Sequence, residues 1–287
     1  MENSRFTVAI IGTGLIGGSL GYALKGFRGC LRVGCDADAA ILSNAVEKGA
    51  IDKAAESVTE AVKTADLSIF CLNPDAVVSE IENAASSFKQ GSVVTEICGV
   101  KSRVSKIIPE LLPDGIHYAG LHPMAGKEVG GFVNAGGNLF RGAGFIIVPA
   151  NAEQAGTAGA VDLLRELSKY VGTSRVPVNT PQAHDRIIGY TSDLMHIAAA
   201  ALCGDYPKDM TIAHTAGAYR DCTRIAEIDA KLWAELLLEN AGYALPHLDA
   251  YIKALENYRE AMAKGDRECL EKLLEASNRN KKEMKTL

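Results

Sequence analysis

A glycine-rich turn between an apolar strand and a helix constrains this fold more than any other feature. Gly12-Thr13-Gly14-Leu15-Ile16-Gly17 follows the apolar run 7–11 and opens a helical stretch. In that context the GxGxxG pattern is typical of a dinucleotide-binding turn. Gly12 allows the tight turn, Gly14 leaves room for a pyrophosphate, and Gly17 lets the helix pack on the strand. An ordinary tight turn without a ligand is the alternative.

An acidic residue follows at the spacing that such a site requires. Asp36 ends the apolar run 31–35, about 20 residues beyond the glycines, where a carboxylate accepts hydrogen bonds from the adenosine ribose hydroxyls. A carboxylate there also repels a 2′-phosphate, so the pattern favours NAD over NADP. Capping of the next helix is the alternative role for Asp36. We also assign Asn73, Pro74 and Gly99 to the cofactor site.

The first half of the chain alternates strand-like and helix-like runs, which indicates a parallel sheet with helices. The predicted strands cover 7–11, 31–35, 67–72, 92–97 and 117–121, and the predicted helices 17–24, 37–48, 74–87 and 103–112. A strand at 143–148, a helix over about 153–170 and a short segment at 175–178 complete this half. From about Thr180 the pattern is helical to the end. We therefore predict a Rossmann-like α/β dinucleotide-binding domain over 1–179 and an all-α domain over 180–287.

Composition excludes several classes of protein. The net charge is −5 and the pI about 5.7, which argues against a nucleic-acid-binding surface. No apolar run approaches the ~20 residues of a membrane span, and the N-terminus reads as a first strand, not a signal peptide. The seven cysteines are scattered without a CxxC pair, as expected for reduced thiols in the cytoplasm.

One segment of the first half carries a candidate acid–base group. His122 follows a strand-like run and precedes Pro123, between Gly120 and Gly126. Its imidazole suits a general base for a hydroxyl that becomes a carbonyl, because the ordinary pKa of histidine lies near neutral pH. Taken alone, a His-Pro pair is more often structural.

The helical half adds further polar candidates. His184, Ser192 and His196 are spaced by eight and four residues on one broad helix face, where they either line a pocket or are satisfied core residues. Arg224 lies in an apolar stretch and pairs either with Asp221 or Glu227 of the protein or with a ligand carboxylate. The spacing of acidic residues and histidines does not indicate a metal site.

These stretches together resemble the prephenate/arogenate dehydrogenase family of tyrosine biosynthesis. The resemblance covers nearly the full chain, and its most specific parts are the segments 120–128 and 221–226, with 184–196 between them and Trp233 after them. It implies a homodimer formed through the helical domain and an NAD-dependent oxidative decarboxylation of prephenate to 4-hydroxyphenylpyruvate. Arogenate, or both substrates, is the alternative.

The resemblance also implies residue roles. His122 matches the catalytic histidine at the C4 hydroxyl, Arg224 the arginine that binds the substrate carboxylate, and His196 a pocket histidine. Glu128 matches an acidic residue that orders the site, and Ser192 is assigned to the substrate. His184 and Trp233 match positions in or beside the pocket.

The chain departs from the family pattern at two places. Gly99 stands where many members have a serine near the nicotinamide, and Asp193 and Met195 replace a histidine and a proline. We expect Asp193 to face solvent, the alternative being a partner for the ammonium of arogenate. Two remoter functions stay open: a β-hydroxyacid dehydrogenase, for which no suitable helical lysine is found, and a non-catalytic NAD-sensing protein.

Overall fold

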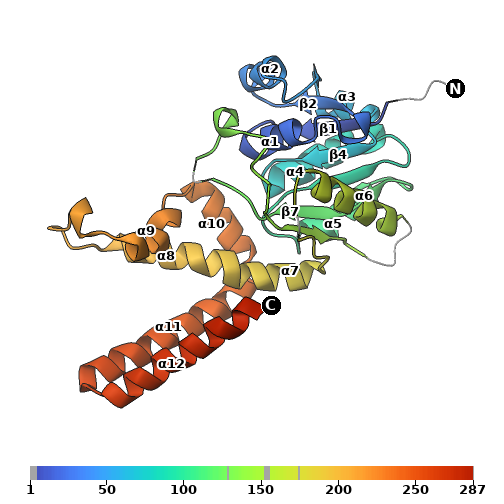
Figure 1. Ribbon diagram of the computed structural model, residues 1–287. Coiled ribbons are helices and arrows are strands. Elements are labelled where there is room, and N and C mark those ends of the chain that lie inside the picture. The colour runs from blue at the N-terminus through green and yellow to red at the C-terminus, as the bar shows by residue number, and fades with distance from the viewer. Residues whose placement is uncertain (1–4, 128, 152–155, 174, 287) are drawn as a thin grey trace.

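Six parallel strands form the central sheet of the protein. The structure, a computed structural model, describes residues 5–127, 129–151, 156–173 and 175–286 (Figure 1). The sheet order is β3-β2-β1-β4-β5-β6. The strands are β1 (Thr7–Ile11), β2 (Leu31–Cys35), β3 (Lys53–Ala54), β4 (Leu67–Phe70), β5 (Val93–Glu96) and β6 (His117–Tyr118). The order reverses between β1 and β4, and such a switch point is where ligands bind in open α/β sheets.

Helices cover both faces of this sheet because successive residues of its strands point to opposite sides. Val8 and Ile10 of β1 belong to one apolar cluster, and Ala9 and Ile11 belong to the other. The first cluster is covered by α1 (Leu15–Ala23), α2 (Ala39–Glu47) and α6 (Thr157–Tyr170), and the second by α3 (Val58–Lys63), α4 (Pro74–Ala84) and α5 (Val104–Leu111).

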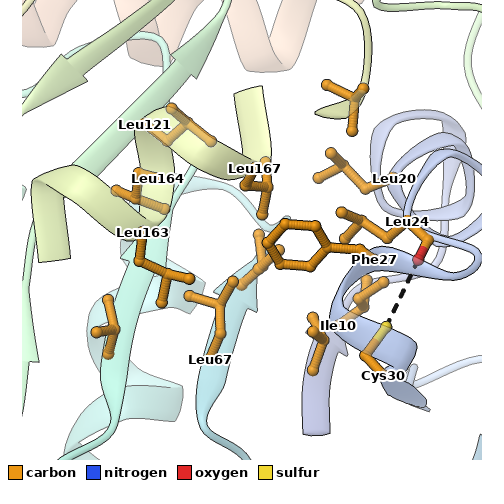
Figure 2. Close-up of a cluster of buried hydrophobic side chains, with 14 of the residues drawn as sticks. Ile10, Leu20, Leu24, Phe27, Cys30, Leu67, Leu121, Leu163, Leu164 and Leu167 are labelled. Atoms are coloured by element: carbon orange, nitrogen blue, oxygen red, sulfur yellow. Dashed lines mark hydrogen bonds between the residues drawn. The ribbon is translucent and has the colours of Figure 1, made fainter. Parts of the chain in front are cut away.

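Phe27 occupies the centre of the first cluster. Figure 2 shows its ring between Leu24, on the α1 side, and Leu167 of α6. Cys30 closes the turn after α1, since its thiol donates to the Leu24 carbonyl at 3.5 Å. This packing fixes α1 against the sheet and so fixes the glycine-rich turn that opens the helix.

A second, two-stranded sheet lies beside the first. Its strands β7 (Gly120–Pro123) and β8 (Phe145–Val148) are antiparallel, so the prediction of one strand over 117–121 was wrong. The chain leaves the main sheet after β6, where Gly120 lies so close to the buried Glu96 that a Cβ would be 2.5 Å from its carboxylate. The segment 175–178 contributes bridges to Gly144 and Ile147.

The remaining predicted elements are confirmed, with ends that differ by a few residues. The sequence analysis missed β3 and α3. Its helix over about 153–170 includes residues 152–155, which lie outside the described part of the chain, and α6 begins at Thr157. Short 3₁₀ turns occur at Phe27–Gly29, Ala85–Ser87, Phe132–Asn134, Ile212–His214, Arg224–Ala226 and Met284–Thr286.

The second half is helical, as predicted. It contains α7 (Pro181–Ile188), a π-helical segment (Gly189–Asp193), α8 (Leu194–Gly204), α9 (Gly217–Thr223), α10 (Ala230–Glu239), α11 (Ala241–Lys264) and α12 (Arg267–Glu283). Figure 1 shows α11 and α12 as a long antiparallel hairpin that projects away from the central sheet.

α7, the π-helical segment and α8 together form one continuous helix over Pro181–Gly204. By length and composition alone it is long and apolar enough to cross a membrane, with a mean hydropathy of 1.2. The sequence analysis missed this because it looked for an uninterrupted apolar run. The helix carries His184 and Asp185, which are buried against the first half of the chain, so its N-terminal part is a packed element of this fold.

Candidate active site

A cavity of about 500 Å³ lies between the carboxyl edge of the central sheet and α10. Seven of the predicted cofactor residues line it: Gly14, Leu15, Ile16, Gly17, Asn73, Pro74 and Gly99. The opposite wall comes from α10 and the turn before it, through Asp229, Lys231, Leu232, Glu235 and Leu236. The helical half therefore closes over the dinucleotide turn.

The glycine-rich turn fits a phosphate group. Gly12 has φ +86°, and a Cβ on Gly17 would lie 1.8 Å from the Gly12 carbonyl oxygen, so both glycines are required by the fold. A Cβ on Gly14 would meet no atom within 4 Å, which leaves the backbone open to a ligand. At Gly14, the N-cap of α1, no side-chain hydrogen bond occupies the helix end among the described residues. Its N–H groups and dipole are available to an anion.

Asp36 supports this turn from the end of β2. One carboxylate oxygen accepts the backbone N–H of Thr13 at 2.6 Å and its hydroxyl at 2.9 Å, and the other accepts the N–H of Asp38 at 3.0 Å. Asp38, not Asp36, caps α2, so the capping alternative for Asp36 is excluded. The oxygen that accepts from Asp38 makes one hydrogen bond and keeps acceptor capacity for a ribose hydroxyl.

His122 lies on β7 and contacts the helical half directly. Its Nδ1 is 2.8 Å from Nε2 of His184 on α7, and Nδ1 of His184 is 2.7 Å from a carboxylate oxygen of Asp185. His184 and Asp185 are fully buried, and His122 keeps a partly exposed edge. Burial, then the charge of Lys101 and the ring of His184, hold the pKa of His122 well below its ordinary value. The ring is therefore neutral and able to accept a proton.

A buried ion pair sits behind His122. Nζ of Lys101 lies 2.8 Å from both carboxylate oxygens of Glu96, and it also donates to the Leu121 carbonyl at 3.1 Å. Tyr118 donates to the same carboxylate at 3.1 Å. Lys101 thus fixes the strand that carries His122 and places a positive charge near the imidazole.

A third group of side chains gathers around α8 and α10. His196 stacks on Trp233 with ring centroids 3.6 Å apart, and its Nδ1 donates to the Ser192 carbonyl at 2.9 Å. Burial lowers the pKa of His196, and the nearby charge of Arg224 lowers it further. The structure therefore brings Arg224, His196 and Trp233 together. Glu128 lies outside the described residues.

Comparison with known proteins decides the family. A protein-family model described as "Prephenate dehydrogenase, nucleotide-binding domain" matches residues 23–176, and one described as "Prephenate dehydrogenase, dimerization domain" matches residues 180–276. This chain belongs to the prephenate dehydrogenase family. The family resemblance seen in the sequence is thereby confirmed, as is the fold class of a nucleotide-binding domain followed by a helical dimerisation domain.

Individual relatives agree with the prephenate dehydrogenase family. The chain is 30% identical to prephenate dehydrogenase of Bacillus subtilis over 94% of this chain and 74% of the relative. It is 29% identical to cyclohexadienyl dehydrogenase of Zymomonas mobilis over 97% and 96%. The fold is similar to prephenate dehydrogenase of A. aeolicus in complex with hydroxyphenyl propionate and NAD⁺, with a TM-score of 0.84, 24% identity and coverage of 98% and 99%.

Two departures from the pattern of the prephenate dehydrogenase family have structural consequences. Asp193 is buried, with 2% of its surface exposed, and accepts a hydrogen bond from Asn240 at 2.5 Å. The expectation that it faces solvent was wrong, because the π-helical segment turns it toward α11. Met195 is 39% exposed. Gly99 lines the cavity, where a Cβ would make ordinary contact with Leu236 at 3.7 Å, so a serine side chain is not excluded by Leu236.

The sequence analysis missed several residues of this site. The sequence analysis assigned no role to Asp185. Within the described ranges no group of three His, Cys, Asp or Glu side chains is placed to hold a metal. The wall formed by α10 was also missed, since a helix that closes a distant turn leaves no local pattern. The buried pair of Glu96 and Lys101 had a signal, namely two charges that flank the apolar end of a strand.

Proposed function

We propose that this protein is an NAD-dependent prephenate dehydrogenase, which converts prephenate to 4-hydroxyphenylpyruvate by oxidative decarboxylation. The observation that carries the proposal is the neutral, partly buried imidazole of His122, held 2.8 Å from His184, in a protein of this family. A neutral histidine beside a hydroxyl is a general base whose loss typically costs ~10²–10⁴-fold in rate.

The residues divide into cofactor and substrate groups. Gly12, Thr13 and Asp36 shape the dinucleotide turn, and the seven cavity residues named above surround the cofactor. Bound NAD⁺ supplies the hydride acceptor. Asp36 accepts the ribose hydroxyls and disfavours a 2′-phosphate.

His122 performs the proton transfer. It accepts the proton of the C4 hydroxyl as the hydride leaves C4, so that a carbonyl forms there. The ring carboxylate then departs as CO₂, its bonding electrons pass through the ring to the C4 oxygen, and the ring becomes aromatic. The C4 oxygen takes back a proton from His122 to give the phenol. Aromatisation drives the reaction forward, and the protein has to position the groups and stabilise charge.

The substrate carboxylate binds at Arg224, near His196 of α8. Arg224 supplies the positive charge, and the ring of His196, held by Trp233 and the Ser192 carbonyl, forms the adjoining wall. Ser192 and Glu128 complete the substrate group. This arrangement favours an anionic substrate.

Three further assignments accompany the proposal. The helical domain forms a homodimer, which its match to a dimerisation domain supports. The boundary between the domains lies at residues 179 and 180, between the bridge at Val178 and the start of α7 at Pro181. The protein acts in the cytoplasm on a small molecule, without nucleic acid or membrane, and its seven free thiols suit that compartment.

The proposal is tested by following NADH absorbance at 340 nm with prephenate and with arogenate, each with NAD⁺ and NADP⁺. We expect the highest kcat/KM with prephenate and NAD⁺. Preference for arogenate would support the alternative substrate, and no turnover of either would leave a β-hydroxyacid dehydrogenase or an NAD-sensing protein. Replacing His122 by asparagine should lower kcat by about 10²–10⁴-fold with little change in KM.

A further inference from the structure

Three side chains form a hydrogen-bonded chain that ends on His122. Asp185, His184 and His122 are joined at 2.7 Å and 2.8 Å through both nitrogens of His184. This row of hydrogen bonds runs from the fully buried Asp185 and His184 to the partly exposed His122. Given the proposed role of His122 as the base, the question is which of its nitrogens carries the proton.

Asp185 determines which atom donates in each of these hydrogen bonds, because an ionised carboxylate can only accept hydrogen bonds. Its two oxygens receive the backbone N–H groups of Lys101 at 2.8 Å and Ser102 at 2.7 Å. Burial acts to raise the pKa of Asp185, but the hydrogen bonds from His184, Ser102 and Lys101 outweigh it and lower the pKa. The carboxylate is ionised, so the proton between it and His184 sits on Nδ1 of His184.

His184 in turn determines which nitrogen of His122 carries the proton. Burial lowers the pKa of His184 although Asp185 acts against it, so the ring is neutral and its Nε2 carries a lone pair. A lone pair 2.8 Å from Nδ1 of His122 requires that nitrogen to donate. The proton of the neutral His122 ring is therefore on Nδ1, and Nε2 is left bare.

We propose that His184 and Asp185 are positioning residues that lock His122 in the tautomer with a bare Nε2, aimed at the substrate hydroxyl. Without this lock the imidazole would also populate the tautomer with a proton on Nε2, which cannot accept another. In the reaction the O–H bond of the substrate breaks and an N–H bond forms at Nε2, while the hydride passes to NAD⁺.

The other charged groups around His122 are compatible with the tautomer that carries its proton on Nδ1. Lys101 and Glu96 face it from β5 and the loop that follows, and they neutralise each other at 2.8 Å. The ammonium disfavours a charged His122 ring in the resting enzyme. After proton transfer, Nδ1 of His122 still donates to His184, and the carboxylate of Asp185 stabilises the new charge through that ring.

The first test measures the tautomers directly, without substrate. In protein labelled with ¹⁵N at histidine, two-bond proton–nitrogen correlations at neutral pH should show both rings protonated on Nδ1 and bare at Nε2. Spectra of the His122→Asn and His184→Met variants identify the signals. A proton on Nε2 of His122 would overturn the proposal, whatever the substrate of the enzyme proves to be.

The second test compares two replacements of His184 that have similar length. Gln retains a hydrogen-bond acceptor for His122 and a donor for Asp185, whereas Met offers only a weak acceptor. We expect His184→Met to lower kcat about 100-fold or more with KM within about two-fold, and His184→Gln to recover at least about ten-fold of that loss. Equal kcat values for the two variants would overturn the proposal.

Asp193→Asn provides the matched control. Asp193 is a second buried carboxyl on the same continuous helix, but its side chain accepts a hydrogen bond from Asn240 and none from His184 or His122. This variant should keep the kcat of the unmodified enzyme. If the unmodified enzyme turns over neither prephenate nor arogenate, the proposed function fails, while the ¹⁵N spectra still decide the tautomer.

Discussion

Replacing Gly14 by alanine separates the cofactor role of the glycine-rich turn from its structural role. A Cβ at this position meets no protein atom within 4 Å and enters the cavity wall, and the backbone φ of −66° lies outside the left-handed region that favours glycine. The fold should therefore tolerate the methyl group, with a change in Tm of no more than about 2–4 °C, equivalent to ~1 kcal/mol. Binding of NAD⁺, by contrast, should be weakened by the methyl group.

The expected loss of affinity follows from the contacts that the methyl group displaces. Charge-assisted hydrogen bonds from the helix end to a phosphate are worth about 1.5–3 kcal/mol each. At ~1.4 kcal/mol for each factor of ten, losing one raises the Kd of NAD⁺ by about 10- to 100-fold, which titration calorimetry measures.

Two other glycines serve as controls for Gly14. Gly159→Ala, on an exposed face of α6 with no atom near its Cβ, should leave the Kd unchanged. Gly17→Ala should destabilise the protein itself, since its Cβ would lie 1.8 Å from the Gly12 carbonyl oxygen. An unchanged Kd for Gly14→Ala would refute the phosphate-binding role of the turn.

Three further predictions concern charges. Arg224→Ala should raise KM for prephenate about 10- to 100-fold with kcat largely retained, because a charge-assisted bond to the carboxylate is lost; an unmoved KM in steady-state kinetics would mean that Arg224 binds within the protein. The pKa of His122 is held well below 6.5 by burial and by Lys101, so the acidic fall of kcat/KM with pH should lie below 6.5, and a fall above 6.5 would contradict the assignment. Burial raises the pKa of Asp193 from 3.8 to about 6, so the folded state loses stability as pH rises through this window. Asp193→Asn should therefore gain up to about 3 kcal/mol of unfolding free energy at pH 7.5 and almost nothing at pH 3.5 in urea titrations; equal gains at both values would exclude the pKa shift as the cause.

Patterns in consecutive residues predicted most of the helices and strands of the first half. The apolar runs and the glycine-rich turn gave β1, α1 and β2 almost to the residue, because turn chemistry and strand periodicity are written in consecutive positions. The short α3 was missed although Ser57 and Glu60 carry a capping pattern, and the side chain of Ser57 does accept the N–H of Glu60.

Contacts between distant segments could not be obtained in this way. The strand over 117–121 reads as continuous in the sequence. The need for glycine at position 120, where the chain changes sheets, comes from the buried Glu96, which is distant in sequence. The burial of Asp193 depends on Asn240 across the helical domain. His122 and Asp36 were found from their local surroundings, whereas the pairing of His122 with His184 needed the relative placement of two domains.

The carboxylate of Asp185 has a consequence for the timing of catalysis. It lies on the helical domain, yet the two N–H groups that hold it belong to Lys101 and Ser102 of the nucleotide-binding domain. If α7 separates from the sheet to exchange ligands, the same motion breaks the link from His184 to His122 on β7. The tautomer of His122 that can accept a proton is therefore held only while the two domains are in contact.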